Sequence, residues 1–541
     1  MDLYLLASGR KFGVVKSDCI SNNGVNVKDV GNALNEGVVG AIDATRKMVV
    51  SLGTVMPEIQ KCGVTFEESS EDVSDFYLVR WDSIDDPLNP KNWPMWKKWI
   101  VVVQISLIAF VVTFGSSVYS SGIGNVSMDF GVSISVSSLG SCVFLVGFGF
   151  GSLPFAPLSG IYGRFVVYFC TLLMFTLFQI GGGCAQNIWT LVILRFFQGF
   201  FGSTPLSNCG GTLSDLFTPI QRTYVLPGFC TFPFLGPIFG PIIGDFICQS
   251  YLGWCWVFWI NMIMGAVVIV IIFFFMPETH GDTILDYKAR YLRNKTRNMK
   301  WHTIHERQRN PRSAIYQACT DSVSLLITEP IVVCFTLYLT VVYIIGYIDF
   351  EGYPIVFAKY SFDQGEIGLS FIGIGIGIVL AGACTPIIYV HYNRVYTRRN
   401  GVMSPEDRLY PLFFGSIMLP ISMFWFAWTC YPYHPYVHWI VPLISSIFFG
   451  WSLLFVFFVS YNYIIDSYQK LAASALAAAT LVRYAASGGM SLVGRPMYVN
   501  LGDHWATSLL GFISVGMIPI PFLFFIYGKK IRGLSKHAYK L

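Results

Sequence analysis

The chain of 541 residues is 54% hydrophobic and 12% charged, and its mean hydropathy of +0.56 is too high for a soluble protein of this length. The net charge of +5 is small and unevenly placed, so it bears on membrane orientation and not on nucleic-acid binding. The 13 cysteines have neither the paired spacing of a disulfide framework nor that of a metal site. Composition therefore predicts an integral membrane protein.

Residues 1–98 are predicted to form a cytosolic N-terminal region that is partly disordered. No charged stretch there precedes an apolar stretch and a cleavage site, so no removable signal peptide is expected. Residues 64–86 are rich in Asp, Glu and Ser and are expected to stay solvated. Trp81 and Trp93 lie in a proline-punctuated approach to the membrane, where tryptophan suits the headgroup region.

Twelve apolar runs of about 20 residues follow, each long enough to cross a bilayer. They are predicted at 99–120, 136–157, 165–185, 189–213, 223–247, 255–276, 330–350, 367–390, 411–430, 438–462, 472–496 and 506–527. A polar, basic loop at 277–328 separates the sixth run from the seventh. The fold class is therefore an all-α membrane protein, with six-helix bundles at 99–276 and 329–527 and a cytosolic tail at 528–541.

Basic residues fix the predicted orientation, because cytosolic loops carry an excess of Lys and Arg. If the N-terminus is cytosolic, one side of the membrane collects Lys97, Lys98, Arg164, Arg222, Arg394, Arg398, Arg399, Arg408, Lys529, Lys530, Arg532 and the central loop. The opposite loops at 248–253 and 430–438 have almost no positive charge. Both termini are therefore predicted to be cytosolic. Asn125 begins a glycosylation sequon on the predicted outer side, and its use stays open.

A repeated Gly-Pro pattern occupies residues 235–244 of the fifth span. Its glycines recur every fourth residue and its prolines lie beside them: Gly236, Pro237, Gly240, Pro241 and Gly244. On a helix the glycines share one face and permit close approach of a second helix, while the prolines bend the helix. The pattern indicates either a tight structural helix pair or a contact used in transport.

Two six-span halves joined by a cytosolic loop suit a transporter whose halves rock around a ligand site near the midplane. A channel would need a ring of selectivity groups, and no filter-like sequence is present. No P-loop is found, and no Cys, His or Ser constellation has catalytic spacing, so an enzyme is not expected. Transport is the leading hypothesis.

The chain resembles a known family, the major facilitator superfamily, and within it the fungal twelve-span drug:proton antiporter branch. That branch includes multidrug, azole, cycloheximide and polyamine exporters. The resemblance runs from Trp81 to Ser535. It rests on Asp85-Asp86-Pro87-Leu88-Asn89-Pro90-Lys91-Asn92-Trp93, Pro157 to Arg164, Arg195-Phe196-Phe197-Gln198-Gly199, the 235–244 stretch, Pro277-Glu278-Thr279, and Asp466 to Tyr498.

The resemblance implies the major facilitator fold with twelve transmembrane helices in two six-helix bundles. It also implies a monomer in the plasma membrane and no cofactor, with the proton gradient as energy source. The 235–244 stretch matches the branch's antiporter motif. The resemblance places Gly163 and Arg164 in the gating loop. Two cytosolic carboxylates, Asp215 and Asp466, are expected to support gating contacts.

Proton coupling needs groups that titrate or hold charge inside the membrane. Arg195, inside span four, takes that role by resemblance, and its alternative is a structural cation bonded to helix carbonyls. Glu351, at the end of span seven beside Asp349, is the first candidate proton carrier unless it is a solvated loop carboxylate. Asp245 is the second. Arg483 mirrors Arg195 in the second half and is expected to be structural.

The substrate cavity is expected to be apolar and aromatic, because ring faces bind varied apolar or cationic molecules. Candidates on the spans that flank the cleft are Tyr119, Phe148, Phe232, Tyr343, Tyr347, Phe458, Tyr461 and Asn462, each of which could instead be a packing or lipid-facing residue. The chain departs from the family at Gly160, Phe165 and Cys255, which lack the usual charges and put the gating equilibrium in doubt.

The sequence thus predicts a proton-coupled exporter of small organic molecules, with apolar or cationic drugs, protons and the lipid bilayer as partners. One alternative is a proton-coupled importer of a small metabolite. Another is a non-transporting membrane sensor whose N-terminal region and central loop bind partners.

Overall fold

The computed structural model describes residues 77–308, 311–399, 404–430, 437–468 and 471–535. The predicted disorder of the N-terminal region falls mainly on residues 1–76, outside the described residues. Contacts divide the chain into two units. In described residues, the smaller unit holds 77–93 and 281–308, and the larger holds 94–280 and 311–535.

The smaller unit joins the approach segment to part of the central loop. Its elements are β1 (Tyr77–Leu78), η1 (Pro90–Asn92), α14 (Gly281–Thr296), β2 (Trp301–His302) and α15 (Ile304–Gln308), and β1 pairs with β2 in parallel. Lys288 Nζ donates to Asp82 Oδ1 at 2.6 Å. The expectation that residues 64–86 are solvated is wrong for Asp86, which is 3% exposed. Its carboxylate is buried because it accepts the backbone N–H groups of Asp82 and Leu88 and closes a turn.

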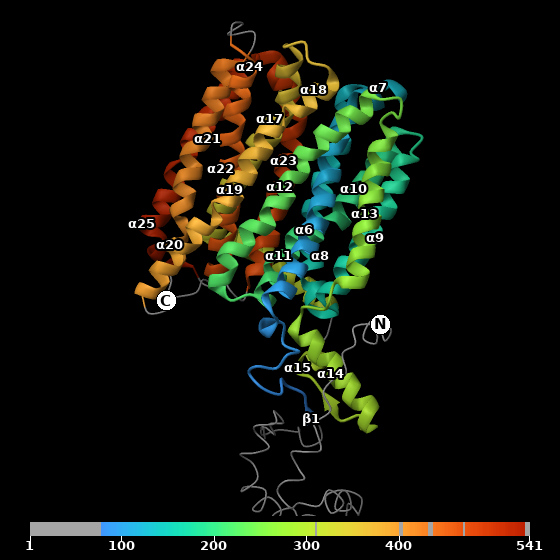
Figure 1. The fold of residues 1–541 in the computed structure, drawn as a ribbon, viewed down its shortest axis with the longest axis vertical. Coiled ribbons are helices and arrows are strands. Elements are labelled where there is room, and N and C mark those ends of the chain that lie inside the picture. Colours follow the sequence, from blue (N-terminus) through green and yellow to red (C-terminus); the bar gives the residue numbers. More distant parts are fainter. Residues whose placement is uncertain (1–76, 309–310, 400–403, 431–436, 469–470, 536–541) are drawn as a thin grey trace, which may run out of the picture. The chain divides into compact units, whose positions relative to one another are not determined.

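The larger unit is a helix bundle built from an N-terminal and a C-terminal half (Figure 1). The N-terminal half contains α6 (Met95–Ser117), η2 (Val118–Gly122), α7 (Ile123–Asp129), α8 (Ile134–Tyr162), α9 (Arg164–Gly183), α10 (Ile188–Gly202), α11 (Thr204–Leu216), α12 (Pro219–Gln249) and α13 (Cys255–Phe275). The C-terminal half contains α17 (Pro330–Ala358), α18 (Gln364–Leu369), α19 (Ile372–Ala383), α20 (Thr385–Arg398), η3 (Pro405–Leu409), α21 (Tyr410–Thr429), α22 (Ile440–Tyr468), α23 (Ala472–Leu501), α24 (Asp503–Met517) and α25 (Pro519–Leu534). Before it, α16 (Pro311–Thr328) of the central segment packs against both α8 and α23.

Eleven helical segments in the described part of the chain are long and apolar enough to cross a membrane, against twelve predicted. The remaining predicted span, 189–213, corresponds to α10 and α11, which are separated at Ser203. Pro205 sits in the first turn of α11, where its missing N–H breaks the run of helical hydrogen bonds. The fourth span is therefore a broken helix, and the twelve-helix, two-bundle fold is confirmed.

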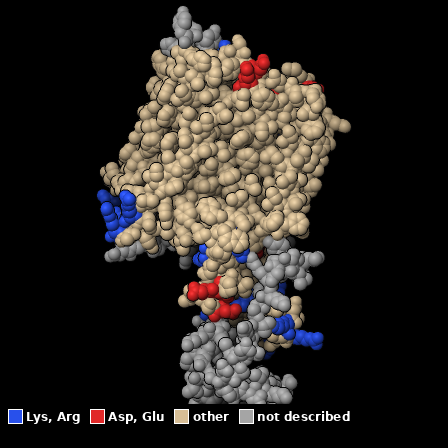
Figure 2. All heavy atoms as spheres, in the orientation of Figure 1, with Lys and Arg blue, Asp and Glu red and all other residues tan. Residues whose placement is uncertain are grey.

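The surface of the bundle has the polarity of a membrane protein. Figure 2 shows a broad belt without charged side chains, with mainly Asp and Glu at its upper edge and a cluster of Lys and Arg at the lower edge of the bundle. We call the lower end, which carries Arg394, Arg398 and Arg399 of α20 and its cap, the basic end. We call the opposite end, where α7 and α18 lie, the distal end (Figure 1).

Each half contains a glycine seam between its second and fourth spans. A Cβ on Gly199 of α10 would lie 2.0 Å from the carbonyl oxygen of Phe144 on α8. A Cβ on Gly377 of α19 would lie 2.0 Å from the carbonyl oxygen of Ile447 on α22. Only glycine permits such backbone contact. The seams therefore hold each half together at equivalent places.

The two halves meet mainly where α8 packs on α23 and where α12 packs on α18 and α19. At the first pair, Ser152 Oγ donates to the carbonyl of Ala477 at 3.2 Å. The site described below lies between these halves.

Candidate functional site

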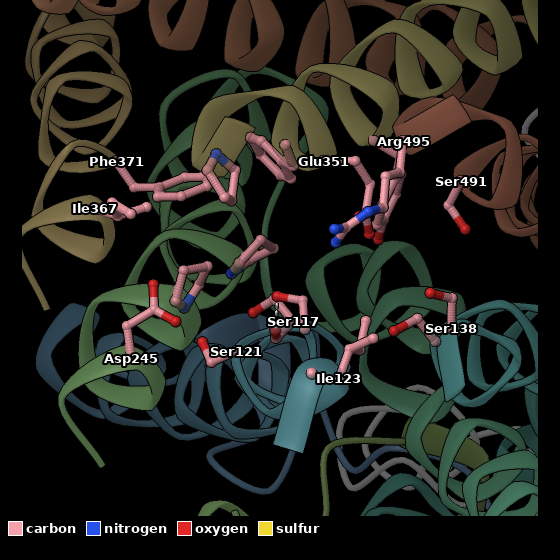
Figure 3. A pocket seen from close by; sticks show the side chains of 18 of the residues that line it. Ser117, Ser121, Ile123, Ser138, Asp245, Glu351, Ile367, Phe371, Ser491 and Arg495 are labelled. Atoms are coloured by element: carbon pink, nitrogen blue, oxygen red, sulfur yellow. Dashed lines mark hydrogen bonds between the residues drawn. The ribbon is translucent and has the colours of Figure 1, made fainter. Parts of the chain in front are cut away.

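A cavity of about 200 Å³ lies between the two halves, where the sequence predicts the ligand site (Figure 3). The N-terminal half contributes side chains from α6, η2, α7, α8 and α12, and the C-terminal half contributes side chains from α17, α18 and α23. Seven serines line it: Ser116, Ser117, Ser120, Ser121, Ser138, Ser141 and Ser491. The pocket is thus rich in hydroxyl groups. The sequence had predicted a mainly aromatic lining, which the pocket does not have.

Both predicted proton carriers line this pocket. Figure 3 shows Glu351 beside Arg495 on one side and Asp245 on the opposite side. Glu351 lies within α17, so the structure excludes the alternative of a loop carboxylate. Asp245, near the end of α12, is 6% exposed and accepts a long 3.5 Å contact from Gln364 Nε2 of the other half. A titratable group from each half therefore faces one cavity.

Asp349, two residues before Glu351, does not line the pocket. It is 1% exposed and accepts a 3.3 Å hydrogen bond from the Tyr498 hydroxyl. Glu351 lies two residues further along α17, about 200° around the helix, and therefore points to the cavity while Asp349 faces Tyr498.

The two faces of the Gly-Pro stretch of α12 make different contacts. Cβ atoms on Gly236, Gly240 and Gly244 would lie 2.1, 2.0 and 2.6 Å from the hydroxyl oxygens of Thr113, Ser117 and Ser121. These partners belong to α6 and η2, so the glycine face packs within the N-terminal half. Pro237 and Pro241 line the pocket instead. The tight helix pair is therefore observed on the glycine face, and the two prolines form part of the cavity wall, while a use of this contact in transport stays a prediction.

Arg195 is a buried cation, 1% exposed, whose nitrogens all donate to oxygens of its own half. Nη1 donates to Gly115 O at 2.7 Å, Nη2 to Ser116 O at 3.2 Å and Nε to Gly140 O at 3.3 Å. The rings of Tyr119 and Phe144 lie 4.7 and 4.5 Å from its Cζ. This is the carbonyl-bonded geometry given above as the alternative for Arg195. It also ties α10 to Ser116, which lines the pocket.

Ion pairs join the halves at the basic end. Arg408 of η3 forms an ion pair with Asp466 of α22, and its Nη1 donates to Thr223 Oγ1 of α12 at 2.9 Å. Arg222 of α12 lies 4.0 Å from Asp466. The predicted gating carboxylate Asp466 therefore bridges cations from both halves, and Arg408 was missing from the predicted site.

The other gating residues cluster within the N-terminal half. Gly163 turns the chain from α8 to α9 with a φ of 96°, which favours glycine. Arg164 Nε donates to Asp215 Oδ2 at 3.1 Å. Glu278 accepts the backbone N–H groups of Arg164 and Phe165 at 2.9 and 3.2 Å, and burial raises the pKa of its carboxyl. Glu278 thus joins the predicted residues Gly163, Arg164 and Asp215 at this loop.

The predicted cavity aromatics are mostly elsewhere. Tyr343 and Tyr347 line a second, smaller cavity of about 40 Å³, and Tyr347 also lines the main pocket. Six predicted residues line neither cavity in the described structure: Tyr119, Phe148, Phe232, Phe458, Tyr461 and Asn462. Tyr119 is held under Arg195, and Phe148 packs on Tyr484 with ring centroids 4.5 Å apart. Their positions on packed faces of their helices explain the difference.

The pocket is reached from the distal end. Its lining includes Ile134 at the start of α8, which is 36% exposed, and Gly124 and Pro354, which are also exposed. Toward the basic end, the contacts of Ser152 and of Arg408 close the space between the halves. In the described part of the chain, the space between the halves is therefore closed toward the basic end.

Two helix bundles with a charged pocket at their interface, open at one end, define a membrane transporter. A family model described as Major Facilitator Superfamily matches residues 105–492. The chain belongs to this superfamily, in the branch that includes fungal efflux-type transporters, and it is a transporter and not an enzyme.

The chain is also similar to individual proteins in sequence and in fold. The chain is 66% identical to "Uncharacterized transporter mfs2" of Schizosaccharomyces pombe, over 100% of both chains. It is 40% identical to "Efflux pump FUBT" of Fusarium oxysporum, over 84% of this chain and 76% of that protein. The solved structure of the proton:xylose symporter XylE has a TM-score of 0.60 at 14% identity, covering 80% of this chain and 96% of that one. This last likeness concerns the fold alone.

Proposed function

We propose that the protein is a proton-coupled exporter of small organic molecules that works by alternating access. The observation that carries the proposal is the placement of Glu351 and Asp245, from opposite halves, in one pocket between those halves. A carboxylate that alternately faces the two sides can bind a proton on one side and release it on the other.

The proton gradient is the energy source and no cofactor is required. One proton moving inward contributes about 2.3 kcal/mol per 100 mV of membrane potential. Glu351 is the first candidate carrier because Arg495 lies beside it (Figure 3) and stabilises its ionised form when the proton leaves. Arg195 acts from a distance in this scheme, since its nitrogens are bonded to carbonyls and it fixes the pocket wall at Ser116.

Export is favoured over import by the efflux pumps among the relatives, of which FUBT is one. We further propose a monomer in the plasma membrane with both termini cytosolic, so that the basic end faces the cytosol. The asymmetry of charge between the two ends supports this orientation. A cysteine replacing Ser138, in the pocket wall, would then react with a membrane-impermeant maleimide from outside intact cells, and one replacing Arg398 would not.

The test is a drug and polyamine susceptibility panel, including apolar and cationic compounds, on cells lacking or overproducing the protein. We expect overproduction to lower accumulation of at least one compound, with efflux falling as external pH rises because fewer protons are available. Glu351→Gln should remove the pH dependence, while Asp282→Asn, an exposed carboxylate of α14, should not. Unchanged accumulation of every compound at normal surface expression contradicts the proposal, and pH-driven uptake would favour the importer.

A further inference from the structure

Arg195 and Arg483, which are at most 1% exposed, differ in how their hydrogen-bond donors are used. All three side-chain nitrogens of Arg195 donate to oxygens of the protein. Arg483 of α23 is 0% exposed, yet only its Nη2 has partners, at 3.0 Å from Tyr461 Oη and 3.4 Å from Thr480 Oγ1. Its Nε and Nη1 donate to no atom of the described residues. A buried cation with two unused nitrogens is costly and calls for an anion.

Among the described residues, the surroundings of Arg483 supply aromatic rings and no carboxylate. Its Cζ lies 4.5 Å from the ring of Tyr343, 4.9 Å from Tyr484, 5.1 Å from Phe457 and 5.5 Å from Tyr461. The titratable groups near it are phenols and thiols: Tyr461, Tyr343, Tyr484, Tyr347, Cys209 and Cys230. Ring faces hold the guanidinium in place by cation–π attraction without consuming its hydrogen-bond donors. We call these four rings the arginine cage.

The rings of the arginine cage lie on one half, and the side chains that pack over them lie on the other half. The four rings lie on α17, α22 and α23 of the C-terminal half. Phe148 of α8 packs on Tyr484 at 4.5 Å between ring centroids, and Phe234 of α12 packs on Phe457 at 4.9 Å. Separation of the halves at the basic end would therefore withdraw both phenylalanines and uncover Arg483.

The cage also adjoins the space that a ligand would use. Tyr343 and Tyr484 line the smaller cavity, which shares Pro237, Tyr347 and Phe350 with the main pocket. A molecule held at Arg483 would thus lie next to the route toward the distal end.

We propose that Arg483 binds the anionic group of the transported molecule, so that the substrates are small organic anions with a carboxylate or sulfonate. This inference rests on the proposed export function and replaces the expected apolar or cationic drugs with anions. Charge-assisted hydrogen bonds from Nε and Nη1 hold the anion, while the rings of the cage contact its apolar part. After passage, the carboxylates of Glu351 and Asp245 disfavour rebinding of an anion from the distal side.

The test measures binding to the full-length protein in nanodiscs by calorimetry, with benzoate, benzenesulfonate and the neutral benzamide as probes. We expect the two anions to bind at least tenfold more tightly than benzamide. Arg483→Gln should abolish this preference, and Arg483→Lys, which keeps the charge with one nitrogen, should weaken it. Lys530→Gln, which removes an exposed cation lying over Tyr527, should keep it. Arg408→Gln, which frees the halves at the basic end, should tighten anion binding.

Each outcome decides the proposal. No preference for anions in the natural protein, or the same preference in Arg483→Gln, overturns it. If Arg483→Gln does not assemble, the Arg483→Lys and Arg408→Gln measurements decide in its place. Anion binding that depends on Arg483 in a protein that exports nothing would refute the proposed function and leave this site standing. Efflux of neutral compounds without anion binding would refute the anion site at Arg483 and leave the proposed export function standing.

Discussion

Arg408 of the C-terminal half donates to Thr223 of the N-terminal half at 2.9 Å while it forms an ion pair with Asp466 of its own half. Arg408 is 4% exposed, so the contact is shielded from water. Hydrogen bonds to charged groups contribute about 1.5–3 kcal/mol each in such settings. The contact therefore favours the state that is closed at the basic end.

Removing this contact should open the basic end. We predict that Arg408→Gln raises the rate at which a maleimide labels Cys209, which is 1% exposed on α11, by roughly tenfold, because about 1.4 kcal/mol changes a population tenfold. Mass spectrometry of the labelled peptide measures the rate. Arg399→Gln removes an exposed ion pair with Asp407 and serves as the matched control. Equal labelling of both variants would show that Arg408 does not hold the halves together.

Filling the glycine face of α12 should loosen the N-terminal half. A Cβ at Gly240 would meet Ser117 Oγ at 2.0 Å and Val118 N at 2.8 Å. We predict that Gly240→Ala lowers the free energy of unfolding by about 1–3 kcal/mol through overpacking, with reduced efflux. At Gly228 the nearest atoms are 3.9 Å away, in Trp99, so Gly228→Ala should leave the melting temperature unchanged. A Gly240→Ala protein with unaltered melting would contradict the close contact.

Glu278 should matter for stability through hydrogen bonding more than through charge. Its carboxylate accepts the N–H groups of Arg164 and Phe165 at the start of α9. Glu278→Ala leaves these donors without their acceptor and should cost about 1–3 kcal/mol in thermal unfolding. Glu278→Gln keeps one acceptor oxygen and should cost less. If both variants melt alike, the hydrogen bonds do not carry the effect.

The smaller unit should lose stability in acid through one ion pair. Arg293 donates to both oxygens of Glu306 at 2.9 and 2.8 Å, and this hydrogen bonding lowers the pKa of Glu306 from 4.5 despite partial burial. A carboxyl whose pKa is lowered by folding stabilises the folded state above its unfolded pKa, and this contribution is lost as pH falls through the lowered pKa.

Hydrogen exchange of the β2 amides measures this effect, taken as the difference between the natural protein and Glu306→Gln. We expect protection to exceed that of the variant at neutral pH and to converge with it in acid. A difference that stays constant across this pH range would contradict the ion-pair explanation.

The spans could be predicted from sequence because each needs a long apolar run, and the sixth, predicted at 255–276, is observed at Cys255–Phe275. The seventh was cut short at 350 because Asp349 and Glu351 look like a loop. In the structure α17 continues to Ala358, since one carboxylate meets Tyr498 and the other faces the pocket.

The pocket chemistry was harder to predict. Its serines are inconspicuous in an apolar span because their hydroxyls bond to the helix itself, as Ser116 and Ser120 do with the carbonyls of Thr113 and Ser117 at 2.6 Å. The clustering of serines at the end of span one was the signal in the sequence that could have indicated a hydroxyl-rich pocket. The partner of Asp466 depends on how distant segments meet, which no local pattern in the sequence encodes.

The glycine seams have a consequence for how this family can diversify. Within the halves, Gly199 and Gly377 leave no room for a methyl group, with a carbonyl 2.0 Å from the position of Cβ. Between the halves, the corresponding distance is 3.0 Å at Gly149 and 2.9 Å at Gly488. A small shift of one half against the other can therefore admit a methyl group at the interface, whereas within a half the two helix backbones would have to separate further. Mutational tolerance should follow this division, with variation concentrated where the halves part.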